Sequence, residues 1–271
     1  MSDPVASASA SPGPRWLYLH GFASSPGSTK ARALAAHYAH HGIVLERLDL
    51  RKPSFERLRL SAIVAHVAAG IGDEHDRALL IGSSLGGLAA CRLAERDARV
   101  CAVVLLAPAF ALAKRWRRRL GESGYSAWRE SDRLETLDHA TGAMRHIDFG
   151  FVEEIERMDA SDAGFPDVRV PTLIVHGVHD ETVGIDQSRE FARTRRHVRL
   201  VEVNDGHELT GSLPRIACEA DAFLAGFLNV GPASNVESSP QITNRARYFG
   251  LCWGGLRRKA NSTWVALRRR V

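Results

Sequence analysis

One serine of this chain stands in a setting that suits nucleophilic catalysis. Ser84 is the centre of GSSLG at residues 82–86, a GxSxG motif that directly follows the apolar run at residues 78–81. A sharp turn between a strand and a helix can hold a serine hydroxyl exposed, and Gly82 and Gly86 leave room for such a turn to close. A Gly-rich turn that binds a phosphate is the alternative, but neither GxxxxGK[ST] nor GxGxxG fits this stretch.

Two later loops supply a base and an acid for this serine. A serine hydroxyl needs a base that takes its proton, and the base needs an anion that holds its tautomer. His207 lies in NDGHE and Asp180 lies in HGVHDE, and each loop follows an apolar run. In a parallel sheet both loops leave the same edge as the turn at Ser84. The order Ser84, Asp180, His207 therefore predicts a catalytic triad, with Glu181 and Asp205 as rival acids.

Acyl transfer also needs hydrogen-bond donors for the negative charge that develops on the carbonyl oxygen. The backbone N–H of Leu85, directly after the nucleophile, is the first candidate. The second is the N–H of Phe22, because His20-Gly21-Phe22 ends the first apolar run and Gly21 lets the backbone approach a substrate closely. A plain turn from a strand into a loop is the alternative interpretation of His20 and Gly21.

Alternating apolar runs and helical patterns must position these residues. The expected strands are residues 16–20, 43–48, 78–81, 100–106, 172–175 and 198–203, and the expected helices are residues 28–40, 55–69, 85–95, 186–195 and 213–228. Strands that alternate with helices predict an α/β fold, with a mostly parallel sheet and helices on both faces. Residues 109–167 break the alternation. They are charged, helical in propensity and without a clear strand, so we interpret them as an inserted helical cap.

Four segments together resemble the alpha/beta-hydrolase superfamily. They are WLYLHGFASSPGSTKA at 16–31, GSSLGG at 82–87, HGVHDETV at 176–183 and DGHEL at 205–209. Within that superfamily, the elements LYLHGF and SSPxSxKA resemble small bacterial YqiA-type esterases. The resemblance covers residues 15–228 and implies a serine esterase or thioesterase that works through an acyl-enzyme, without a metal or organic cofactor. It implies the catalytic and oxyanion-hole roles proposed above. The cap is longer than the corresponding connection in the compact members of that group.

Composition and charge limit the class of protein to which this chain can belong. The 271 residues are 45% apolar and 25% charged, which is typical of a globular protein and excludes a disordered or fibrous one. The net charge is +5, but residues 231–271 hold eight basic groups and one acid, so this segment carries +7 and the rest −2. We expect a disordered lead-in at 1–14, a catalytic domain at 15–228 and a poorly ordered basic tail at 229–271.

The basic tail suggests a second class of function. Its apolar positions from Trp253 to Val271 lie three or four residues apart, a spacing that could form a basic amphipathic helix. The protein would then be an adaptor on a hydrolase scaffold that binds an anionic surface or partner; an accidental pattern in an extension is the simpler interpretation. There is no clear nucleic-acid motif. The N-terminal residues do not read as a secretory signal, and the apolar run Val100–Ala113 is too short to span a membrane, so we expect a soluble cytoplasmic protein.

Two further clusters invite other interpretations. KRWRRR at residues 114–119 begins the cap; a solvated helix face is the simpler interpretation, and an electropositive rim that attracts an acidic substrate is the alternative. Histidines also cluster in two places: His37, His40 and His41 near one helix end, and His176 and His179 around a turn. No cysteine or carboxylate set at ligand spacing accompanies them, so no metal site is expected.

Overall fold

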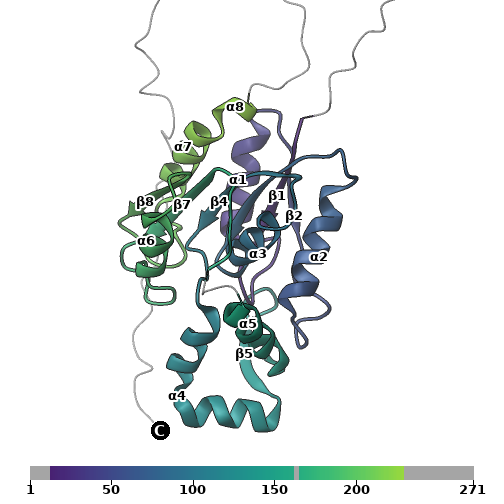
Figure 1. The fold of residues 1–271 in the computed structure, drawn as a ribbon, viewed down its shortest axis with the longest axis vertical. Coiled ribbons are helices and arrows are strands. Elements are labelled where there is room, and N and C mark those ends of the chain that lie inside the picture. The colour runs from purple at the N-terminus through teal and green to yellow at the C-terminus, as the bar shows by residue number, and fades with distance from the viewer. Residues whose placement is uncertain (1–12, 162–164, 229–271) are drawn as a thin grey trace, which may run out of the picture. The chain divides into compact units, whose positions relative to one another are not determined.

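The chain folds around one parallel sheet, in a computed structural model that describes residues 13–161 and 165–228. The strands are β1 (Arg15–Leu19), β2 (Leu45–Leu48), β3 (Ala78–Ser83), β4 (Val100–Leu106), β7 (Thr172–Gly177) and β8 (Val198–Val203). Their order in the sheet is β2-β1-β3-β4-β7-β8, and every pairing is parallel (Figure 1). All six expected strands are present. Apart from residues 13 and 14, the expected lead-in lies outside the described residues, as does the whole basic tail.

Helices cover both faces of this sheet. They are α1 (Thr29–Ala39), α2 (Leu60–Ile71), α3 (Leu85–Ala94), α6 (Asp186–Arg193), α7 (Leu213–Phe223) and α8 (Ala225–Leu228). Side chains alternate along each strand, so Trp16 and Tyr18 pack with α1 and α7 while Leu17 and Leu19 pack with α2 and α3. The α/β fold with helices on both faces is therefore confirmed. No helix among the described residues is long and apolar enough to cross a bilayer.

The burial of the strands explains why apolar runs in the sequence predict them. Strands β3 and β7 lie inside the sheet and are buried at every position, whereas the edge strands β2 and β8 each have one fully buried position and are otherwise half-buried or exposed. A strand covered on both faces needs a continuous apolar sequence. Because all six strands are parallel, the loops that follow β1, β3, β7 and β8 leave the sheet at one edge.

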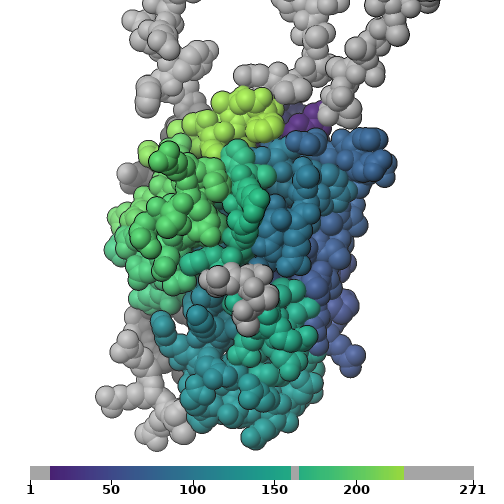
Figure 2. Space-filling model, in the orientation of Figure 1, coloured from purple at the N-terminus to yellow at the C-terminus, as the bar shows by residue number. Residues whose placement is uncertain are grey.

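The insertion at residues 109–167 contains more than helices. It consists of α4 (Leu112–Ser131), β5 (Leu134–Asp138), β6 (Ala143–Ile147) and α5 (Gly150–Ser161), where β5 and β6 form an antiparallel hairpin. The expectation of a cap without strands was therefore wrong. The turn between the strands is built by Asp138, whose carboxylate accepts hydrogen bonds from the Ala140 N–H and the Thr141 hydroxyl, and by Gly142 at φ 73°. The labelled α4, β5 and α5 gather at one end of the sheet in Figure 1, and Figure 2 shows the teal side chains of the cap packed against that end.

Candidate active site

Ser84 occupies a strained turn between β3 and α3. Its backbone has φ 52° and ψ −114°, a conformation that a residue other than glycine rarely adopts. Its N–H donates to the carbonyl of Leu106 at 2.9 Å, and its carbonyl accepts from the N–H of Ala109 at 3.0 Å. A Cβ on Gly82 would collide with the backbone of Gly86, so the turn can close only with glycine there. The turn leaves Ser84 half-buried among fully buried neighbours.

Three of the predicted residues form a chain of hydrogen bonds. The Oγ of Ser84 lies 3.1 Å from Nε2 of His207, and Nδ1 of His207 lies 2.7 Å from Oδ2 of Asp180. A carboxylate only accepts hydrogen bonds, so Nδ1 carries the proton, and Nε2 is left with a lone pair for the Ser84 hydroxyl. The arrangement presents an imidazole nitrogen that can take the proton of the serine.

Asp180 is held as a carboxylate by its surroundings. Burial alone would raise its pKa, but hydrogen bonds from His176, from His207 and from the N–H of Val183 hold the pKa well below its usual range. Its Oδ1 accepts from the N–H groups of Thr182 at 2.9 Å and Val183 at 2.7 Å. Each carboxylate oxygen therefore has a fixed set of donors, and the side chain has one orientation.

His176 is the residue of this site that sequence reasoning missed. It is fully buried, and its Nε2 lies 3.1 Å from Oδ2 of Asp180 and 2.8 Å from the carbonyl of Val183. Both of those neighbours are acceptors, so Nε2 donates and Nδ1 accepts from the hydroxyl of Ser188 at 2.8 Å. The available signal was a single histidine directly after the apolar residues 173–175 of β7, four residues before the acid. Its apparent companion His179 instead contacts Oδ1 of Asn204 at 2.7 Å.

The two rival acids lie in other surroundings. The carboxylate of Asp205 accepts from the backbone N–H groups of Gly206 at 2.8 Å and Ser212 at 2.9 Å, so it organises its own loop. Glu181 is exposed. Of the acids considered from the sequence, Asp180 is the one that contacts His207.

The loop after β1 lies directly beside the serine. A Cβ built on Gly21 would lie 3.3 Å from the Cβ of Ser84, so only glycine allows this approach without displacement. His20 is buried, and its Nδ1 lies 2.8 Å from the carbonyl of Gly21 while its Nε2 accepts from the N–H of Leu50 at 3.0 Å. Burial lowers the pKa of His20, which favours the neutral ring that these contacts require.

The contact between His20 and the carbonyl of Gly21 also orients the next N–H. The carbonyl of Gly21 and the N–H of Phe22 belong to one trans peptide unit and point in opposite directions. Neither the N–H of Phe22 nor that of Leu85 donates to an acceptor within residues 13–161 and 165–228. Two backbone donors in this region are thus free to bind a ligand.

A family model decides the relationship of this chain. The model of the uncharacterised protein family UPF0227 matches residues 15–222. The chain belongs to this family. No curated protein sequence matches.

Solved structures of low sequence identity share the α/β-hydrolase fold of this UPF0227 member. Alpha/beta hydrolase domain-containing protein 10 from mouse is 19% identical with a TM-score of 0.65, over 79% of this chain and 92% of that one. Est1E from Butyrivibrio proteoclasticus, solved with ferulic acid bound, is 22% identical with a TM-score of 0.65, over 79% of this chain and 89% of that one. A monoacylglycerol lipase from Paleococcus ferrophilus is 16% identical with a TM-score of 0.59, over 78% and 96% of the two chains.

The cap packs onto the loop that carries Phe22. The Phe22 ring lies 5.5 Å from the ring of Trp116 in α4, 5.8 Å from that of Phe151 in α5 and 6.3 Å from that of Phe55 in the loop after β2. The hairpin adds a backbone bond, because the N–H of His139 donates to the carbonyl of Ala23 at 2.9 Å. The cap and the loop after β1 are therefore one packed unit beside Ser84.

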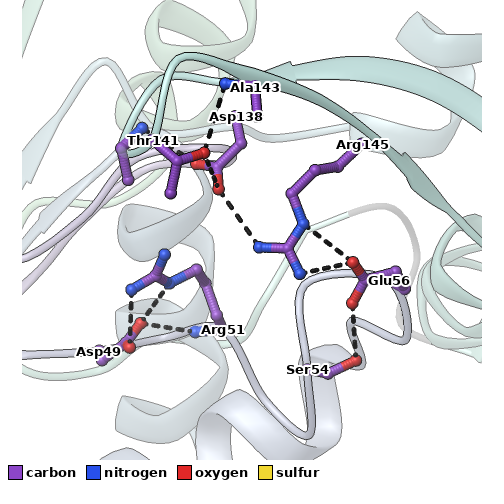
Figure 3. Close-up of polar contacts among 9 residues, drawn as sticks. Asp49, Arg51, Ser54, Glu56, Asp138, Thr141, Ala143 and Arg145 are labelled. Atoms are coloured by element: carbon purple, nitrogen blue, oxygen red, sulfur yellow. Dashed lines mark hydrogen bonds and ion pairs between the residues drawn. The ribbon is translucent and has the colours of Figure 1, made fainter.

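Ion pairs fasten the hairpin to the loop after β2 (Figure 3). The Arg145 guanidinium donates to the carboxylate of Glu56 at 2.9 Å and to the buried carboxylate of Asp138 at 3.4 Å. A second arginine, Arg59, binds both oxygens of Asp148 at 2.7 and 2.8 Å. Bidentate arginine–carboxylate pairs such as Arg59–Asp148 fix geometry as well as adding stability, so these contacts orient the hairpin and the start of α5 against the loop after β2.

One cluster could hold a metal ion, away from the serine. Nε2 of His37 lies 2.9 and 2.8 Å from the two carboxylate oxygens of Asp221, and with His41 the three donor atoms lie within 4.8 Å of one another. The sequence does not reveal this carboxylate as a partner of the histidines, because Asp221 comes from α7 and lies far from them in the chain. His37 lies near the end of α1, which runs back from the edge of the sheet where Ser84 lies. The ion pair between His37 and Asp221 is sufficient to explain the contact.

Proposed function

We propose that this protein is a serine hydrolase that cleaves a carboxylic ester or thioester through an acyl-enzyme. The observation that carries the proposal is the unbroken chain of hydrogen bonds from Ser84 through His207 to Asp180, which begins at a strained turn between a strand and a helix. This combination of a strained serine, an oriented imidazole and a buried carboxylate is what nucleophilic acyl transfer requires.

In the first half of the reaction, Nε2 of His207 takes the proton of Ser84 as the serine oxygen attacks the carbonyl carbon of the substrate. The imidazolium that forms is stabilised by the charge of Asp180, which keeps its own ionised state. His207 then gives the proton to the leaving alcohol or thiol, and the acyl group stays on Ser84. In the second half, His207 activates a water molecule that releases the acid and restores the serine.

The oxyanion of each tetrahedral intermediate is bound by the N–H groups of Phe22 and Leu85. Both donors are without a partner in the described part of the chain, and Leu85 begins α3, where the helix dipole favours negative charge. His20 supports this site as a positioning residue, because its bond to the Gly21 carbonyl fixes the peptide unit that carries the Phe22 N–H.

The proposed bond type draws support from proteins of the same fold. One similar structure is Est1E with ferulic acid bound, and another is a monoacylglycerol lipase. The hydrogen-bonded residues here need no metal or organic cofactor for that chemistry. The adaptor alternative rests on the basic tail, which lies outside the described residues, so the described site favours the hydrolase.

The proposal is tested by hydrolysis of p-nitrophenyl esters of increasing chain length, together with thioester substrates. We expect turnover by the wild-type protein and a loss of at least about 10³-fold in kcat for Ser84→Ala. Ser126→Ala, which removes an exposed serine of the cap, is the matched control and should keep full activity. Equal rates for wild type and Ser84→Ala would refute the mechanism.

A further inference from the structure

A cavity of about 370 Å³ lies between α4 and the start of α6. Its α4 wall presents three cations, Lys114, Arg115 and Arg118, and its opposite wall presents the acids Asp186 and Glu190. The charges of the two signs thus line opposite walls. This part of α4 is the basic segment KRWRRR, whose charges suggest a rim that attracts an acidic substrate.

Arg115 is the unusual cation of this wall. Its Nη1 is shielded from solvent and has no hydrogen-bond partner among the described residues. Burial lowers the pKa of Arg115 to about 10, against the opposing charges of Asp180 and Asp159, so the guanidinium is charged at neutral pH. The neighbouring Arg117, in contrast, lies 3.6 Å from a carboxylate oxygen of Glu122.

A charged donor that is buried without an acceptor costs free energy, because the water it has lost is not replaced. A bound anion would supply the missing acceptor. A guanidinium presents a planar fork of donors that fits the two oxygens of a carboxylate or phosphate. The acids Asp186 and Glu190 would repel an anion from their side of the cavity. An anion would therefore bind at the α4 wall.

The cavity adjoins the groups proposed to be catalytic. One wall includes Ala111, two residues after Ala109, whose N–H donates to the carbonyl of Ser84. The other includes Gly184, which follows Val183, the donor to Oδ1 of Asp180. A substrate that used both places would have its reacting carbonyl at Ser84 and an arm in this cavity.

We propose that the Arg115 guanidinium binds a negatively charged group, a carboxylate or a phosphate, on the substrate that Ser84 attacks. The proposal rests on the proposed hydrolase function and narrows its substrate class to anionic esters or thioesters. Arg115 acts on binding of the substrate, and Ser84 and His207 carry out the chemical step.

Matched substrates test the proposal in the full-length protein. The p-nitrophenyl monoester of glutarate is compared with p-nitrophenyl pentanoate, and the butyryl ester of glycerol phosphate is compared with butyryl glycerol. We expect Arg115→Gln to lower kcat/KM about tenfold or more for at least one anionic member, mainly through KM, and to change the neutral members less than twofold. The pair that responds distinguishes a carboxylate from a phosphate.

Arg119→Gln is the matched control, because Arg119 lies on the same helix but does not line the cavity. It should leave all four substrates unchanged. An Arg115→Gln protein that loses activity equally on neutral and anionic substrates, or on neither, would overturn the proposal.

A separate measurement keeps this proposal distinct from the hydrolase function. If the protein hydrolyses none of the four substrates, calorimetric titration with glutarate and with inorganic phosphate decides the matter. Binding that Arg115→Gln weakens at least tenfold would uphold the anion site while the hydrolase function fails. Identical titrations of wild type and Arg115→Gln would overturn the anion site itself.

Discussion

Replacing Asp180 by asparagine tests whether this carboxylate sets the tautomer of His207. The orientation of the new side chain follows from the backbone around it. Oδ1 of Asp180 accepts from the N–H groups of Thr182 and Val183 at 2.9 and 2.7 Å, and an amide NH₂ at that position would face two donors. The asparagine carbonyl must therefore stay there, and its NH₂ must point toward His207 and His176.

The proton on His207 then has to move. Nδ1 of His207, which lies 2.7 Å from Oδ2 in the wild type, would face an N–H donor and could only accept. The ring proton would lie on Nε2, at 3.1 Å from Oγ of Ser84, and no lone pair would remain to take the serine proton. We expect kcat to fall about 10⁴-fold, which corresponds to about 5 kcal/mol of lost transition-state stabilisation.

The assay is kcat for p-nitrophenyl butyrate, together with nitrogen NMR of the His207 ring, which reports the protonated nitrogen directly. Glu181→Gln is the matched control, because Glu181 is the exposed acid next in sequence and should be dispensable. An Asp180→Asn protein with more than a tenth of the wild-type kcat would refute the reasoning. So would an unchanged tautomer of His207.

Three further predictions concern stability. Arg145→Gln removes the ion pair with Glu56, and we expect a loss of about 1 kcal/mol and faster hydrogen exchange across residues 134–147. Gly86→Ala places a Cβ against the carbonyl of Leu19, where the backbone cannot yield, so denaturant unfolding should show a loss of at least about 3 kcal/mol. The pKa of Asp180 is lower in the folded protein than in the unfolded chain, where an aspartate has a pKa of about 3.9. The ionised carboxylate therefore stabilises the fold above a pH of about 3.9, and this stabilisation is lost progressively as the pH falls below that value. The free energy of unfolding in urea should therefore fall less between pH 6 and pH 3 for Asp180→Asn than for wild type.

The strands and the loop residues could be predicted because their signals are local. Apolar runs mark β3 and β7 because those strands are buried on both faces. Parallel pairing then places Ser84, Asp180 and His207 at one edge of the sheet. Their positions after the ends of parallel strands therefore predict that they lie close together.

The features that escaped prediction depend on partners far away in the chain. The hairpin of β5 and β6 has mostly polar or exposed positions, and distant groups such as Glu56 and the carbonyl of Ala23 hold it in place. The bond from His176 to Asp180 depends on the buried position of β7. A list of residue types also does not reveal that, in KRWRRR, Nη1 of Arg115 is shielded from solvent without a hydrogen-bond partner among the described residues.

In the proposed mechanism, Ser84 is an activated nucleophile. The most direct test is labelling with a serine-directed fluorophosphonate, followed by peptide mass spectrometry to locate the adduct. We expect one adduct, on Ser84, and no adduct in the Ser84→Ala and His207→Ala proteins. Labelling of a different residue, or undiminished labelling of Ser84→Ala, would contradict it.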